Sequence, residues 1–130
     1  KEEQFVLRRE RSILGAMMNN FYLLKDLDET LAEIHISNTD LSTLRDNIIG
    51  LLSNEKIKTS LELKELLINK GYSNLIKSHF ATDDCLKFNL VENFADEKTD
   101  YDEAKKALMN VILMQEEWYK KKNKTLSKIS

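Results

Sequence analysis

The sequence is poor in the residues that interrupt regular structure. It contains no proline, three glycines and one cysteine among its 130 residues. Because proline and glycine commonly end helices and strands, their scarcity favours a helical chain with short connections. A single cysteine excludes a disulfide within the chain and fits a reducing compartment, so we expect a cytoplasmic protein. No apolar run approaches the roughly 18 residues that a membrane-spanning helix needs, and no apolar leader precedes the first predicted helix.

An excess of charge of one sign is also lacking. The net charge is −2, which argues against a domain whose main task is to bind nucleic acid. Hydrophobic residues make up 42% of the chain and charged residues 32%, a balance typical of a folded domain with its own core. We expect one domain over residues 1–122, followed by a C-terminal tail over residues 123–130. Because the first residue is Lys1, we also expect the chain to be a segment of a longer protein.

The most apolar helical pattern lies near the C-terminus, over residues 101–119. Asp100 and Glu103 have the spacing of an N-cap and its capping-box partner, and lysines follow the other end of the pattern. A helix that is apolar on most sides needs neighbours on most sides. The pattern therefore predicts an all-α bundle of about six helices, built round a long C-terminal helix. Its broad inner face is predicted to hold Tyr101, Ala104, Leu108, Val111, Ile112, Gln115, Trp118 and Tyr119.

Shorter helices are predicted earlier in the chain from apolar residues that recur every three or four positions. Residues 81–98 fit this pattern poorly, and we expect a short helix or an extended segment there. The first four predicted helices cover residues 2–18, 21–34, 41–52 and 61–70, with caps from Asn20 and Thr59 and a stop at Gly71. A short fifth helix, capped by Ser73, is predicted to hold Leu75, Ile76 and Phe80.

Glu10 occupies an unusual place, in the middle of the apolar face predicted for the first helix. One interpretation is a structural role, in which the carboxylate forms an ion pair or caps the end of another helix. The other is a catalytic acid, but no second acid, histidine or cysteine can be placed beside Glu10 from the sequence. Gly15, inside the same helix, indicates close approach of another helix.

Groups with recognisable chemistry are few. His35, His79 and Cys85 are isolated, so their spacing offers no metal site, and no glycine-rich loop could hold a phosphate. We expect no cofactor and no metal in this segment. The acidic pairs at 83–84 and 116–117 are typical of solvated surface. The lysines of residues 120–124 complement a helix end or form a weak contact with an acidic partner or nucleic acid. These features favour a binding domain over an enzyme.

Apolar residues outside the main face of the long helix suggest where a partner would bind. Met109 and Leu113 lie well outside that face, and Met114 lies at its edge. Either other helices cover these side chains, or they form a docking surface, for which methionine is suited because it repacks easily. Our predicted partner-binding residues are Met109, Leu113, Trp118, Tyr119, Leu126 and Ile129.

Residues 9–20, Arg-Glu-Arg-Ser-Ile-Leu-Gly-Ala-Met-Met-Asn-Asn, resemble the first helix of two related bacterial domains. One is the C-terminal, helicase-binding domain of DnaG-type DNA primase, and the other is the N-terminal domain of the DnaB-type replicative helicase. Residues 37–46 look like the capped third helix of the primase domain, and Asp102-Glu103-Ala104 followed by Leu108 looks like the start of its last helix. The Gly-Gly-x-Tyr-Leu element typical of the helicase domain is not found.

The primase resemblance implies a non-catalytic domain of a primer-synthesising nucleotidyltransferase. Such a domain docks on the N-terminal domain of the replicative helicase and couples primer synthesis to the replication fork. We expect it to be a monomer in isolation. Better-known members continue their long helix into a helical hairpin, for which the residues after Asn123 are too few, so the contact residues of the family are not carried over. The alternative is the helicase domain itself, which self-associates and contacts primase.

Overall fold

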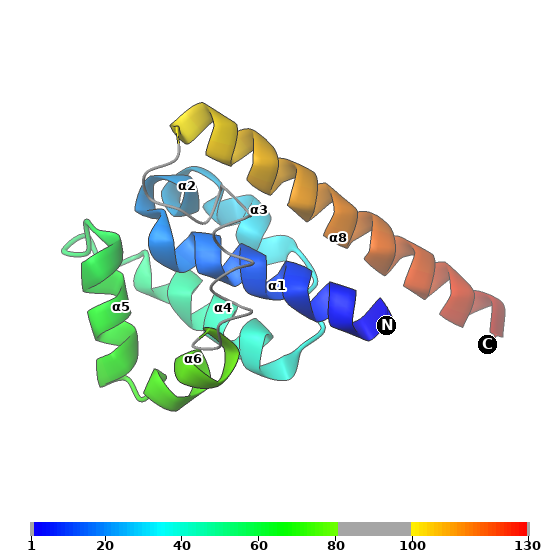
Figure 1. Ribbon diagram of the computed structural model, residues 1–130, viewed down its shortest axis with the longest axis horizontal. Helices are drawn as coiled ribbons and strands as arrows, with labels where there is room; N and C mark the ends of the chain where they lie inside the picture. The colour runs from blue at the N-terminus through cyan, green and yellow to red at the C-terminus, as the bar shows by residue number, and fades with distance from the viewer. Residues whose placement is uncertain (1, 81–99, 130) are drawn as a thin grey trace.

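The computed structural model describes residues 2–80 and 100–129, and the side chains of that part up to Lys124. Within these ranges the chain forms seven helices and no strand, which confirms the predicted all-α bundle with a long C-terminal helix (Figure 1). The expectation for residues 81–98 falls outside the described residues. The helices are α1 (Glu2–Asn19), α2 (Phe21–Asp26), α3 (Asp28–Glu33), α4 (Thr39–Leu51), α5 (Ser60–Asn69), α6 (Ser73–Phe80) and α8 (Tyr101–Ile129).

Helix α1 holds the bundle together, because it contacts α2, α4, α5, α6 and α8. Its C-terminal half is buried on every side, from Ser12 to Met18, and includes Gly15. Figure 1 shows α8 along one edge of the molecule, α5 and α6 toward the opposite edge, and α1 between them. The C-terminal helix α8 is the longest, as predicted, but the bundle is built round α1 and not round α8.

The prediction of a single helix over residues 21–34 is wrong, because the chain there forms two helices, α2 and α3, that are divided at Leu27. At Leu27 the backbone has φ −110° and ψ 18°, which lies outside the helical region. Hydrogen bonds nevertheless continue across the break, from the Leu27 amide to the Leu23 carbonyl and from the Leu31 amide to the Leu27 carbonyl. The apolar spacing is preserved, so Leu24, Leu27, Leu31 and Ile34 all remain buried.

Side chains cap four of the helices at their N-termini, where backbone amides lack partners. The predicted stop at Gly71 is confirmed, since this glycine has φ +97° and the Tyr72 amide bonds back to the Leu67 carbonyl. Ser73, predicted as the N-cap of the next helix, is instead the first residue of α6, and the Tyr72 carbonyl accepts the bond from the Ile76 amide. The capping bonds run to Asn20 Oδ1 from the Leu23 amide, to Asn38 Oδ1 from the Leu41 amide, to Thr59 Oγ1 from the Glu62 amide and to Asp100 Oδ2 from the Glu103 amide.

Replacing Thr59 with alanine is expected to lower the free energy of unfolding by about 1 kcal/mol, because the Glu62 amide at the start of α5 loses its acceptor. Urea denaturation measures the change. Thr43→Ala is a matched control, since Thr43 is exposed within α4 and should change stability by less than about 0.5 kcal/mol. Equal effects of the two substitutions would contradict a capping role for Thr59.

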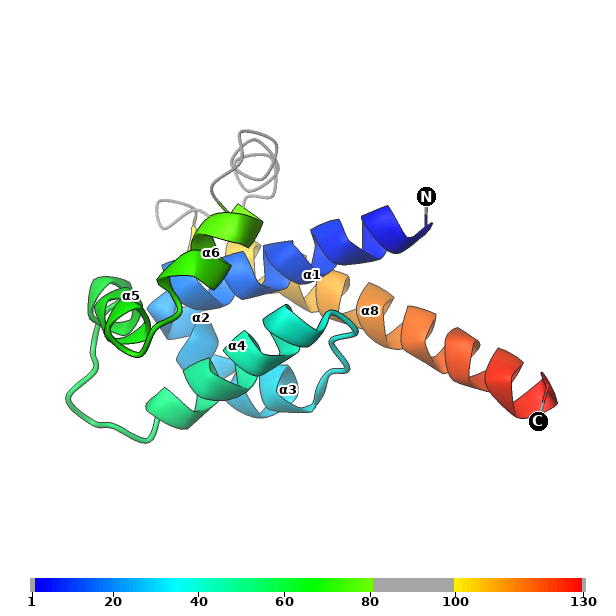
Figure 2. The same ribbon diagram turned by 90° about the horizontal axis from the view of Figure 1, so that it is seen from below.

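Helix α8 packs against α1 and α2 through one face, on which Ala104, Leu108, Ile112 and Gln115 are buried. Its helical backbone continues through the residues predicted to form a tail, as far as Ile129. In Figures 1 and 2 the C-terminal turns of α8 run past the N-terminus of α1 and project from the bundle. No helix in the described part of the chain has both the length and the apolar character needed to cross a membrane.

Candidate functional site

Glu10 lies at the centre of a buried polar cluster between α1, α8 and the start of α4. Its side chain is inaccessible to solvent, and both carboxylate oxygens accept hydrogen bonds. Oε2 accepts from the Ser37 amide at 2.7 Å, the Ser37 hydroxyl at 2.9 Å and Gln115 Nε2 at 2.8 Å, while Oε1 accepts from the Asn38 amide at 3.1 Å. Since Asn38 is the N-cap of α4, the carboxylate occupies the positive end of that helix dipole.

Gln115 joins this cluster to the rest of α8. Its amide nitrogen donates to Glu10 and also to the His35 carbonyl at 2.9 Å, while its Oε1 accepts from Arg9 Nε at 2.7 Å. One buried side chain therefore connects α8 with α1 and with the connection between α3 and α4. The sequence placed Gln115 on the inner face of the helix, but its partners lie 80 to 106 residues away and left no local signal.

Arg9 and the aromatic residues of α8 form the outer part of this contact. The Arg9 guanidinium lies 5.9 Å from the centroid of the Trp118 ring, and Lys122 Nζ lies 5.0 Å from it. Burial lowers the pKa of Arg9, while the carboxylates of Glu10 and Glu2 act in the opposite direction. Arginine nevertheless stays charged in proteins, so a cation remains against the ring.

A cleft of about 700 Å³ opens between the first turns of α1 and the C-terminal half of α8. Glu10 contributes to its floor, but the hydrogen bonds already made by the carboxylate hold that group in a structural position. In the described part of the chain, no group of three histidines, cysteines or acids is placed to hold a metal ion. The cleft is lined by Glu2, Glu3, Val6, Leu7, Glu10, Ser37, Asn38, Trp118, Lys121 and Lys122.

The two histidines of the chain are separated and both have structural contacts. The His35 ring stacks on Tyr119 with centroids 4.0 Å apart. Arg11 Nε donates to His79 Nδ1 at 3.3 Å, so Nε2 carries the ring proton and donates to Asp40 Oδ2 at 3.2 Å. The buried His79 thus joins α6 to α1 and α4.

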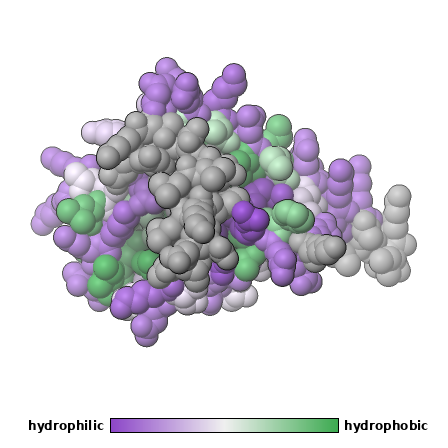
Figure 3. All heavy atoms as spheres, in the orientation of Figure 1, coloured by the Kyte–Doolittle hydropathy of each residue, from purple (hydrophilic) through white to green (hydrophobic). Residues whose placement is uncertain are grey.

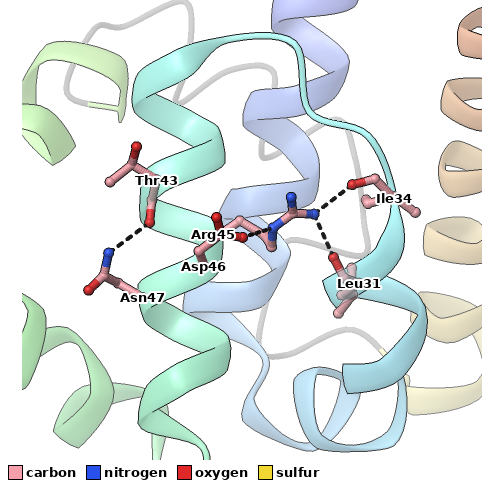
Figure 4. Close-up of polar contacts among 6 residues, drawn as sticks. All are labelled: Leu31, Ile34, Thr43, Arg45, Asp46 and Asn47. Carbon is pink, nitrogen blue, oxygen red and sulfur yellow. Dashed lines mark hydrogen bonds and ion pairs between the residues drawn. The ribbon is translucent and has the colours of Figure 1, made fainter.

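Arg45 joins α4 to the C-terminal end of α3. This structural role of Arg45 was not predicted from the sequence. The residue is 7% exposed, and its Nη1 donates to the carbonyls of Leu31 at 2.9 Å and Ile34 at 2.6 Å (Figure 4). Carbonyls at a helix C-terminus lack partners within the helix and carry partial negative charge, which a guanidinium satisfies. The Arg45–Asp46 ion pair is peripheral, because the Asp46 side chain is 66% exposed.

Outside its buried face, α8 carries apolar side chains that the bundle leaves uncovered. Met109 is 41% exposed, Leu113 is 53% exposed and Met114 is 54% exposed. On the face shown in Figure 3, the coloured hydrophobic residues form small separate areas within a mostly hydrophilic surface. The sequence left open whether other helices cover these side chains. No helix covers them in the described structure, so they are accessible to a partner.

The six predicted partner-binding residues do not lie on a single surface. Met109 and Leu113 are one turn apart on the outer face, whereas Trp118 and Tyr119 are partly buried in contacts with Arg9 and His35. These aromatic residues hold α8 against the bundle. The side chains of Leu126 and Ile129 lie outside the described side chains.

Comparison of the chain with protein-family models, with curated proteins and with solved structures finds no match.

Proposed function

We propose that this chain is a protein-interaction domain, and that it corresponds to the non-catalytic, helicase-binding part of a bacterial DnaG-type primase. The observation that carries the proposal is the outer face of α8, where Met109 and Leu113 are exposed one turn apart, while Met114 is exposed on another side of the helix. Large exposed apolar side chains grouped on one surface mark sites of protein association. The partner would be the N-terminal domain of the replicative helicase, in the cytoplasm.

The assignment to the primase class depends on the residue string of α1. Its least expected residue, Glu10, has a structural part to play, since its carboxylate bonds to backbone amides before α4. Because these bonds occupy the Glu10 carboxylate, a structural role for this residue is favoured over a role in catalysis. The cluster thereby favours a domain whose function lies in its surface, with any polymerisation carried out elsewhere in a longer protein.

Titration of the chain with the N-terminal domain of the bacterial replicative helicase tests the proposal. Saturable binding at tens of micromolar or tighter, measured by isothermal titration calorimetry, is the expected result. An absence of heat and of any chemical-shift change at these concentrations would overturn the proposed function.

Leu113→Glu is expected to weaken helicase binding at least about tenfold, because it places a charge where the partner must cover an apolar side chain. Leu61→Glu is the matched control, since Leu61 is 65% exposed on α5 and lies on another surface. Both variants should unfold at the same urea concentration as the parent. If the two substitutions weaken binding equally, α8 is not the docking surface.

A further inference from the structure

The exposed face of α8 has a regular spacing that the proposed function does not require. Six residues follow one another at intervals of four, three, four, three and four positions. This alternation of four and three, in which two steps make seven residues, is the one by which a helix presents a continuous seam to another helix. Five of the six side chains are exposed and that of Glu116 is partly exposed. The residues of the seam are Asp102, Lys106, Met109, Leu113, Glu116 and Lys120.

The chemistry of this seam is complementary to itself when the helix is reversed. Within the seam, positions at equal distances before and after Val111 carry complementary groups, either an acid and a lysine or two apolar side chains. Nine residues away, Asp102 corresponds to Lys120, and five residues away, Lys106 corresponds to Glu116. The pair Met109 and Leu113, two residues away on each side, forms an apolar centre.

We propose that two copies of this chain associate through their α8 helices, which lie antiparallel and cross at Val111. In this arrangement every acid of the seam faces a lysine of the other copy, and Met109 of each copy contacts Leu113 of the other. A parallel pairing in register would instead place each charged group opposite the same group, which is unfavourable. The inference does not depend on the proposed function.

The position of α8 in the fold permits this pairing. At 3.6 residues per turn, the buried residues Ala104, Leu108, Ile112 and Gln115 lie about a third of a turn round the helix from the seam. Because α8 runs along one edge of the molecule, no other described helix covers the seam (Figure 1). Such an interface is isologous and closes at two copies.

The contact is expected to be weak. The seam from Asp102 to Lys120 is about 27 Å long, and one helix face buries less surface than a stable interface of standard size. We expect a dissociation constant on the order of 0.1 mM, so that the chain is monomeric at low micromolar concentration. Added salt should weaken the association further, because the charged pairs are exposed.

Sedimentation equilibrium of the full chain between about 10 μM and 1 mM tests the proposal. The parent chain should show a monomer–dimer equilibrium. Lys106→Glu and Glu116→Lys should each weaken the dimer at least about tenfold, since each substitution creates two repulsive pairs in a symmetric dimer. An equimolar mixture of these two variants should recover association close to that of the parent, because every cross-copy pair is then of opposite charge.

The recovery in the mixture is specific to the antiparallel seam. Lys56→Glu and Glu65→Lys make the same changes of charge on exposed residues away from α8 and should leave the equilibrium unchanged. A chain that stays monomeric at 1 mM, a dimer that is insensitive to the α8 substitutions, or a mixture that fails to recover association would each overturn the proposal. Assemblies larger than a dimer would overturn it as well.

Discussion

Replacing Glu10 with alanine is expected to lower the free energy of unfolding by about 3–5 kcal/mol, enough to unfold a domain of average stability in mild denaturant. The substitution removes the acceptor for the amides of Ser37 and Asn38, the hydroxyl of Ser37 and the side chain of Gln115. Buried donors left without a partner are costly, and the start of α4 also loses the negative charge that complements its dipole. Urea denaturation followed by circular dichroism measures the loss.

Glu3→Ala is the control for this prediction, since Glu3 is exposed on the same helix and should change stability by less than about 0.5 kcal/mol. Glu10→Gln should have an intermediate effect, because it keeps one carbonyl oxygen but turns an amide group toward donors. A variant of Glu10 that remains as stable as the parent would contradict the structural role assigned to the carboxylate.

Replacing Arg45 with alanine is expected to lower the free energy of unfolding by about 2–4 kcal/mol. The carbonyls of Leu31 and Ile34 at the end of α3 would lose a charged donor in a buried position, and the aliphatic part of the arginine would leave a void. Arg45→Lys should recover only part of the loss, because an ammonium group cannot reproduce the planar arrangement of guanidinium donors.

Asp46→Ala separates the two contacts that Arg45 makes. Its carboxylate is exposed, so removal of this ion pair should cost less than about 1 kcal/mol. If Asp46→Ala destabilised the domain as much as Arg45→Ala, the ion pair rather than the bonds to α3 would account for the effect. Thermal unfolding of the three variants at one protein concentration provides the comparison.

Local patterns in the sequence predicted most of the helices, because the signals that start and stop them lie within a few residues. Asn20, Thr59 and Asp100 were recognised as caps and Gly71 as a stop, and all four act as expected. The break at Leu27 was missed, because the apolar spacing continues across it and only the backbone angles change.

The contacts within the polar cluster could not be predicted in the same way. Glu10 meets donors 27 and 105 residues further along the chain, and no pattern in one sequence connects such distant positions. The exposure of Met109 and Leu113 followed from their position on the helical wheel. The inward contacts of Trp118 and Tyr119, however, required knowledge of where Arg9 and His35 lie.

The bond between Glu10 and Gln115 joins α1 to α8, across 105 residues. Ribosomes deliver a chain from its N-terminus, so α1 emerges long before the side chain that completes its polar cluster. Until then Arg9 and Glu10 must remain hydrated, and the surface that α8 later covers stays open. The domain consequently reaches its final form only when the last helix docks, which places this contact among the late events of folding.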